Sequence, residues 1–166
     1  NDSAMSEEIR NAFEETLEQL ISTRAREGEK LGMHVLDRCD SVAAQISLLR
    51  ERIPEIIVST NDRHAQRIAD FSPDTDKARI EQECALLVQK LDISEEIDRL
   101  EAHLEEVRRV IGHGSPAGRR LDFLMQELNR EANTVGSKSA HIDSSAASVE
   151  LKVLIEQMRE QIQNIE

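Results

Sequence analysis

Residues 31–53 read LGMHVLDRCDSVAAQISLLRERI, and this stretch decides the fold. Its apolar side chains recur at intervals of four, four, three, four, three and four residues, at Leu31, Val35, Cys39, Val42, Ile46, Leu49 and Ile53. This spacing puts one apolar stripe along an α-helix and is typical of a coiled-coil-like interface. We therefore expect a long helix that packs its stripe against other helices.

The same helix is expected to extend over residues 6–52, which contain no proline. Its first half continues the stripe, at Ile9, Phe13, Leu17 and Leu20. Gly28 and Gly32 mark a weak point between the two halves, because glycine lowers helix propensity. A helix of this length is on the order of 70 Å long at 1.5 Å per residue, and it cannot bury its stripe alone.

Five further helical stretches follow, at 55–71, 76–91, 95–111, 119–135 and 144–165. Pro54 is expected to end or kink the first helix. Ser94 is expected to be the N-cap of the helix at 95–111, and a break in the helix is expected near Gly136. The sequence thus predicts an all-α protein. A long antiparallel helical hairpin or coiled-coil-like arm over residues 1–75 packs with a C-terminal helical bundle over residues 76–166. Residues 1–5 are expected to be native linker or a cloning remnant.

The composition supports this class and excludes several others. With three prolines, six glycines, no tryptophan and no tyrosine in 166 residues, a β-sandwich or barrel is not expected. No window approaches 18 uninterrupted apolar residues, so no membrane span is expected, and no secretion leader is visible at Asn1. Cys39 and Cys84 are two unpatterned thiols, which suit a reducing compartment. We expect a cytoplasmic protein.

The charge is unevenly distributed along the chain. The 33 acidic and 21 basic residues give a net charge of −12, which predicts repulsion from nucleic acid if the charge is evenly spread. Residues 108–138, however, hold six Arg and Lys against three Asp and Glu, a local charge of +3, which leaves −15 for the rest. A basic island in an acidic chain indicates a phosphate-bearing partner, and a solvated helix face explains it equally well.

Glu96, Arg99 and His103 lie at positions i, i+3 and i+7, so they share one helix face. A carboxylate, a guanidinium and an imidazole together can bind a divalent metal, hold a phosphate and move a proton. A helical hairpin could also bring Glu83 from the preceding helix near Glu96. The alternative is a surface ion pair beside an ordinary exposed histidine.

Residues 119–133 read RRLDFLMQELNREAN. The apolar residues Leu121, Leu124, Met125, Leu128 and Ala132 predict a core stripe, and Phe13, Phe71 and Phe123 are also expected on core stripes. No aromatic platform for single-stranded nucleic acid is therefore expected. The opposite face is crowded with polar residues, namely Asp122, Gln126, Glu127, Asn129, Arg130, Glu131 and Asn133. Asparagine is a poor helix former, so its use here indicates either a functional face or a buried polar network between helices.

Four segments resemble a known family. They are 91–103 (LDISEEIDRLEAH), 118–134 (GRRLDFLMQELNREANT), 137–139 (SKS) and 149–166, and they resemble the C-terminal half of the bacterial YicC-like endoribonucleases. Arg24, Glu27 and Gly28 fit the R-x-x-E-G pattern of that family. The resemblance implies an endoribonuclease that acts on single-stranded RNA, including small regulatory RNA, and depends on Mn²⁺ or Mg²⁺. It also implies a homo-oligomer, here formed through the long helices, and an N-terminal domain that this chain lacks.

On that resemblance, the polar residues take three roles. The metal-ligand candidates are Glu83, Glu96, His103 and Glu127. The catalytic candidates are Glu96, Arg99, His103, Asp122, Glu127 and Glu131, with Asp122 or Glu131 orienting a nucleophile. The RNA-binding candidates are Arg119, Arg120, Asn129, Arg130 and Lys138.

The alternative function is a non-catalytic helical scaffold that mediates oligomerisation of a larger RNA-binding protein. In a scaffold the polar residues would satisfy one another in a dry network, whereas in an enzyme they would converge on an open, wet cleft.

Overall fold

A computed structural model describes residues 2–71, 81–86, 92–113, 117–138 and 142–163 of the chain. Over these residues it is helical without a strand, which confirms the all-α prediction. The four long helices are α1 (Asp2–Phe71), α3 (Ser94–Gly112), α4 (Gly118–Lys138) and α5 (Ile142–Ile162), and residues 81–86 are also helical. The rest of the helix predicted over 76–91 lies outside the described residues. No helix in the described part of the chain has the length and apolar character needed to cross a bilayer.

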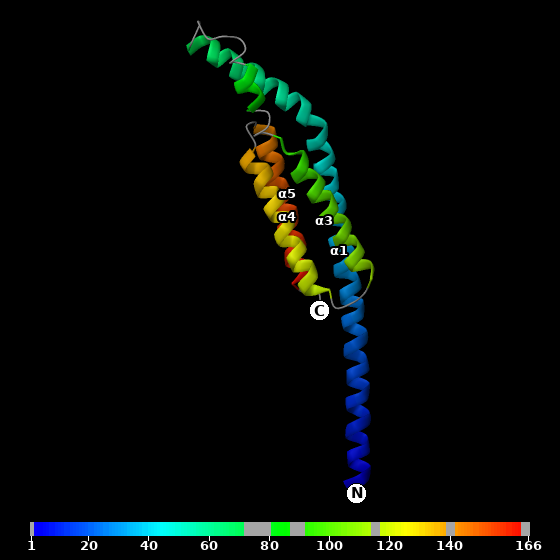
Figure 1. Cartoon of the computed structure of the whole chain (residues 1–166). Coiled ribbons are helices and arrows are strands. Elements are labelled where there is room, and N and C mark those ends of the chain that lie inside the picture. Colours follow the sequence, from blue (N-terminus) through cyan, green and yellow to red (C-terminus); the bar gives the residue numbers. More distant parts are fainter. Residues whose placement is uncertain (1, 72–80, 87–91, 114–116, 139–141, 164–166) are drawn as a thin grey trace.

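The four long helices form an up-down-up-down bundle around one core (Figure 1). The middle of α1 packs on α3 and α5, while α4 packs on α3 and α5, so each helix contacts two neighbours. In Figure 1 α1 runs well beyond the bundle toward the N-terminus. The predicted antiparallel helical packing is confirmed, and the predicted boundary between residues 1–75 and 76–166 stays a prediction.

Every helix of the bundle contributes a buried stripe at helical spacing. The expected residues of α1 are buried from Val35 to Leu49. The α3 stripe contains Ile97, Leu100, Leu104 and Val107, and α4 contributes the predicted set from Leu121 to Ala132. Because neighbouring helices bury these stripes against one another, the helices derive their stability from packing rather than from intrinsic propensity.

The prediction that the first helix gives way to a second one after Pro54 is wrong. α1 continues through Pro54 to Phe71 as one helix. A proline removes a single backbone donor, which a long, otherwise regular helix tolerates at the cost of a bend. Figure 1 shows α1 curving beyond the bundle, where its ribbon changes from cyan to green. Of the two effects expected at Pro54, an end of the helix or a kink, the structure therefore agrees with the kink.

Two other predicted helix boundaries are wrong. Ser94 is the first residue of α3 rather than its N-cap, and its backbone N–H donates to the Asp92 carboxylate at 2.9 Å. Hydrogen bonds from Ser94 lower the pKa of Asp92. Gly136 does not interrupt α4, because it lies within the helix at a close approach to α5, where an added Cβ would stand 2.5 Å from the Ser148 Oγ.

The N-terminal half of the apolar stripe has no covering helix in the described chain. Ile9, Phe13, Leu17 and Leu20 are all exposed. Phe13 is therefore not a core residue here, contrary to the prediction, and the side chain of Phe71 lies outside the described residues. A single chain thus buries only the second half of its long stripe.

Candidate functional site

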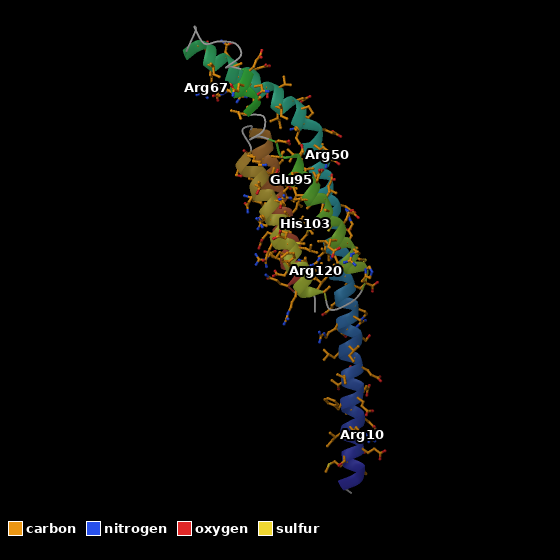
Figure 2. The ribbon with its side chains drawn as sticks, in the orientation of Figure 1. Arg10, Arg50, Arg67, Glu95, His103 and Arg120 are labelled. Atoms are coloured by element: carbon orange, nitrogen blue, oxygen red, sulfur yellow. The ribbon has the colours of Figure 1, made fainter. Side chains whose placement is uncertain are left out.

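A row of polar side chains follows the line along which α3 and α4 pack, and we call it the polar seam. From α3 it contains Glu96, Arg99, His103 and Glu106, and from α4 it contains Lys138, Glu131, Glu127 and Arg120. The two helices are antiparallel, so the start of α3 meets the end of α4. His103 and Arg120 mark this side of the bundle in Figure 2.

The middle of the polar seam brings together His103, Glu127 and Glu131. One ligand atom from each side chain lies within 4.8 Å of the others. Glu131 is buried, with 4% of its surface exposed, whereas His103 and Glu127 are half-buried and open toward solvent. Within the described part of the chain, no hydrogen bond or ion pair engages the side chain of His103 or of Glu127. These three side chains are therefore the best candidate metal ligands.

Arg99 connects this cluster to the surface of α3. Its Nη1 lies 3.4 Å from the Glu131 Oε1, and its Nη2 also pairs with Glu95 on its own helix. The Glu95 carboxylate first, and Glu131 second, raise the pKa of Arg99. A permanent cation beside the two acids of the cluster reduces their mutual repulsion and also offers a binding partner to a phosphate.

At one end of the polar seam, Glu96 pairs with Lys138. The Lys138 Nζ lies 2.8 Å from the Glu96 Oε1 and donates to the Asp92 carbonyl at 2.9 Å. Glu96 is buried and its other carboxylate oxygen has no hydrogen-bond partner among the described residues. The structure therefore places these two candidates in an ion pair that ties the end of α4 to the start of α3, apart from the cluster.

At the other end, Glu106 joins two arginines. The Arg109 side chain donates to it at 2.7 Å, and the Arg120 Nη2 lies 3.2 Å away. These partners, Arg109 foremost, lower the pKa of Glu106 to about 2. The predicted phosphate ligand Arg120 is thus held in place by a carboxylate of the neighbouring helix.

Five predicted site residues lie outside the polar seam. Glu83 is exposed on the helical segment 81–86, and Arg119 is exposed at the start of α4. Asp122 accepts a hydrogen bond from Gln126 at 2.8 Å and lies 3.7 Å from Arg159 of α5, so it faces away from α3. Asn129 and Arg130 line a groove between α4 and α5.

That groove has a volume of about 410 Å³ and is rich in amides and arginines. Its lining residues are Met125, Gln126, Asn129, Arg130, Asn133, Thr134 and Arg159. The polar face expected on α4 is thus divided. Glu127 and Glu131 face α3, while the asparagines and the predicted RNA ligand Arg130 face the groove.

Sequence reasoning missed the position of Phe123. It is 47% exposed on α4, so the prediction of a core phenylalanine is wrong. At about 100° per residue, Phe123 lies roughly 200° round the helix from Leu121 and hence opposite the core stripe. The angular position of Phe123 relative to this stripe was the signal that could have predicted its exposure.

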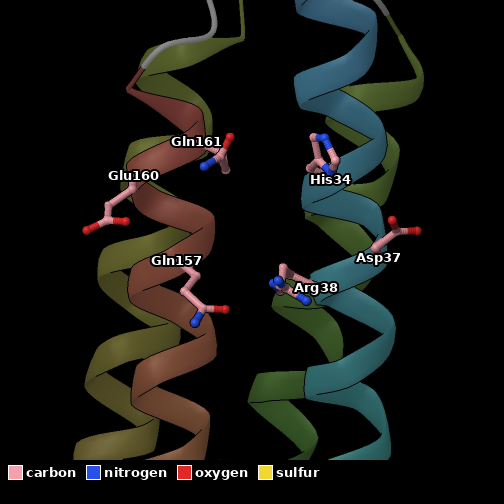
Figure 3. A pocket seen from close by; sticks show the side chains of 6 residues that line it. All are labelled: His34, Asp37, Arg38, Gln157, Glu160 and Gln161. Carbon is pink, nitrogen blue, oxygen red and sulfur yellow. The ribbon is translucent and has the colours of Figure 1, made fainter.

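A second polar groove, of about 330 Å³, lies between α1 and α5 (Figure 3). His34, Asp37 and Arg38 line it from α1, and Gln157, Glu160 and Gln161 line it from α5. Since α3 packs on α4 and α1 packs on α5, this groove and the polar seam lie on opposite sides of the bundle. Among the described residues, the metal-ligating side chains that converge lie in the polar seam and not in this groove, so the polar seam remains the candidate site.

The arrangement of the polar seam supports a defined set of chemical tasks. One imidazole and two carboxylates suit a divalent cation of the Mn²⁺ type. Exposed arginines beside them can hold phosphate oxygens, and a half-buried histidine can transfer a proton. Such a combination is suited to cleavage of a phosphodiester.

Comparison with known proteins agrees with this chemistry. The family model described as "Endoribonuclease YicC-like, C-terminal" matches residues 49–166. A protein of Haemophilus influenzae named "Probable endoribonuclease YicC" is 47% identical over 163 residues, which cover 98% of this chain and 57% of that protein. A protein of Clostridioides difficile with the same name is 36% identical over 161 residues, 95% of this chain and 55% of that protein. The chain thus spans little more than half the length of these curated relatives.

Proposed function

The chain belongs to the YicC-like endoribonuclease family, and from this premise we propose that it is the catalytic and assembly part of a divalent-metal-dependent enzyme that cleaves single-stranded RNA. The observation that carries the proposal is the meeting of His103, Glu127 and Glu131 in the polar seam. The family supplies the reaction class, and the cluster supplies a place on this chain where the reaction can occur.

The donor set fits the metal that the family resemblance implies. His103, Glu127 and Glu131 would hold the ion, because their ligand atoms converge and two of them have no other described partner. When bound, the ion would supply charge neutralisation at the scissile phosphate and a lowered pKa for a bound water. Glu96 and Glu83, predicted as further ligands, lie outside this cluster, so we do not assign them to the ion.

The arginines of the polar seam orient the RNA backbone in this proposal. Arg99 and Arg120 project from α3 and α4 on either side of the cluster, and both are largely exposed. Their planar guanidinium groups can bind phosphate oxygens bidentately. The local charge of +3 over residues 108–138 concentrates this attraction on one part of an otherwise acidic chain.

A carboxylate of the cluster can move a proton. His103 would hold the ion through its imidazole, whereas the half-buried Glu127 carboxylate would keep its second oxygen free to accept a proton from the attacking group. Attack by water and attack by the 2′-hydroxyl of the RNA both need such a group. They differ in their products, because only internal attack leaves a 2′,3′-cyclic phosphate.

The proposal includes self-assembly through the long helix. Met5, Ile9, Phe13, Leu17 and Leu20 form an exposed apolar stripe at helical spacing beyond the bundle. A second copy can bury this stripe against its own, as coiled-coil helices do. The complete protein would then be a homo-oligomer in the cytoplasm, a reducing compartment that suits the two free cysteines of this chain.

The alternative function is the non-catalytic scaffold, and two ion pairs favour it. Glu96 with Lys138 and Glu106 with Arg120 satisfy one another across the polar seam, as in a network that only fastens helices together. The open carboxylate of Glu127 and the unengaged imidazole of His103 favour the enzyme.

The test is cleavage of an end-labelled single-stranded RNA by this chain and by the complete protein, with Mn²⁺, with Mg²⁺ or with EDTA. We expect metal-dependent cleavage that falls at least a hundredfold in Glu127→Gln and His103→Ala. Glu150→Gln, which removes an exposed acid of α5 away from the polar seam, is the matched control and should cleave at a rate close to wild type. Normal cleavage by Glu127→Gln and His103→Ala would leave the scaffold as the function of these helices. A panel of small regulatory RNAs would test the substrate class.

A further inference from the structure

Phe123 is an unexpected surface residue. The chain has three phenylalanines and no tryptophan or tyrosine, and this one stands 47% exposed on α4. Its exposure is not part of a larger apolar patch, because the helical neighbours at the same face, Arg120, Gln126 and Arg130, are polar or charged. A protein partner that buries apolar surface would find little else to contact here.

An arginine is associated with the ring of Phe123. The Arg120 guanidinium carbon lies 5.8 Å from the ring centroid, within the range of a cation–π contact. Glu106 holds the same guanidinium from α3 at 3.2 Å. The ring therefore lies beside a fixed positive group, the combination with which proteins bind a nucleobase and its phosphate together.

Phe123 also has a defined place relative to the cluster and the groove. It precedes Glu127 by one helical turn, roughly 6 Å along the axis at 1.5 Å per residue. On one side of its line along α4 lie Glu127 and Glu131. On the other side lies the groove of about 410 Å³ that contains Asn129, Asn133 and two arginines.

We propose that Phe123 is a stacking platform for one nucleobase of a single-stranded RNA. The strand crosses α4 between the amide-lined groove and the His103–Glu127–Glu131 cluster. Arg120 and Arg130 contact the phosphates on either side of the stacked base, and the groove receives a neighbouring nucleotide. This inference rests on the proposed function, because it assigns a subsite to the same substrate. A π-face is common to all four bases, so the platform selects unpaired RNA over duplex without selecting a sequence.

The experiment measures binding separately from cleavage, on the complete protein with EDTA present. Fluorescence anisotropy gives the Kd for a labelled oligouridine and for a matched abasic oligonucleotide that keeps the backbone and lacks the bases. We expect Phe123→Leu to weaken binding of the oligouridine about tenfold and to leave binding of the abasic strand unchanged. Phe123→Trp should retain wild-type affinity, because it keeps an aromatic face.

Two controls separate stacking from charge and from general surface effects. Arg130→Ala should weaken binding of both strands and reduce the dependence of log K on log salt by about one phosphate contact, whereas Phe123→Leu should leave that slope unchanged. Val149→Ala, which trims an exposed apolar residue of α5, should bind both strands as the wild type does.

The outcomes distinguish this proposal from the proposed function. Equal binding of oligouridine by Phe123→Leu and wild type, or no binding by wild type, overturns the stacking site. If Phe123→Leu clearly weakens binding but the wild type never cleaves RNA, the stacking site is retained and the proposed enzymatic function is overturned. If the wild type cleaves RNA and Phe123→Leu does not change binding, only the proposed enzymatic function is retained.

Discussion

The Glu131 carboxylate lies 3.4 Å from the Arg99 guanidinium, across the boundary between α4 and α3. Glu131 is the most buried acid of the candidate site, whereas Arg99 is about half exposed. The pair thus joins an interior group to a surface group at the point where the cluster opens to solvent. Because a buried carboxylate without a cation is costly, either Arg99 or a bound metal must compensate its charge.

This dependence gives a prediction for metal binding. Glu127→Gln and Glu131→Gln should each lower the affinity for Mn²⁺ at least about tenfold, since loss of even an outer-shell partner costs that much. The readout is the signal of free Mn²⁺ in an electron paramagnetic resonance titration, which does not depend on activity. Dialysis against EDTA should return the wild type to the metal-free state.

Glu83→Gln and Asp122→Asn are the matched controls for this titration. Both remove a carboxylate that lies outside the cluster, so both should bind Mn²⁺ as the wild type does. An equal loss in the control variants would mean that the ion is attracted by the general acidity of the chain rather than held by these ligands.

The fold was largely predictable because each helix carries its core stripe in its own sequence. The residues from Val35 to Leu49 show the helical period, and they are buried as predicted. Boundaries were less predictable. Pro54 and Gly136 carry local signals for ending a helix, and tertiary packing outweighed both, since Gly136 lies where α5 approaches closely.

For the candidate site, the sequence predicted which residues share a helix face but not which residues of the neighbouring helix they meet. Spacing placed Glu96, Arg99 and His103 on one face of α3, and the structure puts all three in the polar seam. Spacing within one helix cannot say which residue of α4 each of them meets. The antiparallel register of α3 and α4 fixes these partners, so that Lys138 pairs with Glu96 and Glu131 lies beside His103.

The ion pair between Glu96 and Lys138 predicts a structural effect. In Lys138→Ala the buried Glu96 carboxylate loses its cation, so we expect the free energy of unfolding to fall by about 2 kcal/mol. This is less than the loss for a fully buried pair, because Lys138 is 31% exposed. Urea denaturation followed by circular dichroism measures the change.

Arg50→Ala is the comparison for this prediction. It breaks an exposed pair with Asp98, 2.8 Å long, and should cost less than about 1 kcal/mol. If both substitutions cost the same, burial of Glu96 does not make its pair important for stability.

Alanine substitutions at two helical glycines should change the stability of the protein in opposite directions. At Gly136 an added methyl group would stand 2.5 Å from the Ser148 Oγ, whose hydroxyl donates to the Ala132 carbonyl. Gly136→Ala should therefore destabilise the protein by about 1 kcal/mol, as overpacking exceeds the gain in helix propensity. Gly28 has nothing within 4 Å of its added methyl group, so Gly28→Ala should raise stability by about 0.5–1 kcal/mol. A higher thermal midpoint in both variants would contradict the close approach of α4 and α5.

The two cysteines predict a difference in reactivity. Cys39 is fully buried in α1, and desolvation raises the pKa of its thiol to about 11, whereas Cys84 is partly exposed. Because this pKa lies about two pH units above that of an ordinary thiol, Cys39 carries roughly a hundredfold less thiolate at pH 8. The thiolate is the form that reacts. We expect iodoacetamide to label Cys84 first. Mass spectrometry of the digested protein measures both sites, and in guanidinium they should label at similar rates.

The same thiol makes stability depend on alkaline pH. The folded state resists ionisation of Cys39 until about pH 11, while an unfolded thiol ionises near pH 9. The unfolded state therefore releases its proton first, so the free energy of unfolding should fall as the pH rises from about 9 to 11, and should be unaffected by this group below pH 9. Urea denaturation of wild type and Cys39→Ala across pH 8 to 11 isolates the effect, because the variant lacks the ionising group. The difference in stability between the two proteins should shrink as the pH rises, and a constant difference would mean that Cys39 ionises equally in both states.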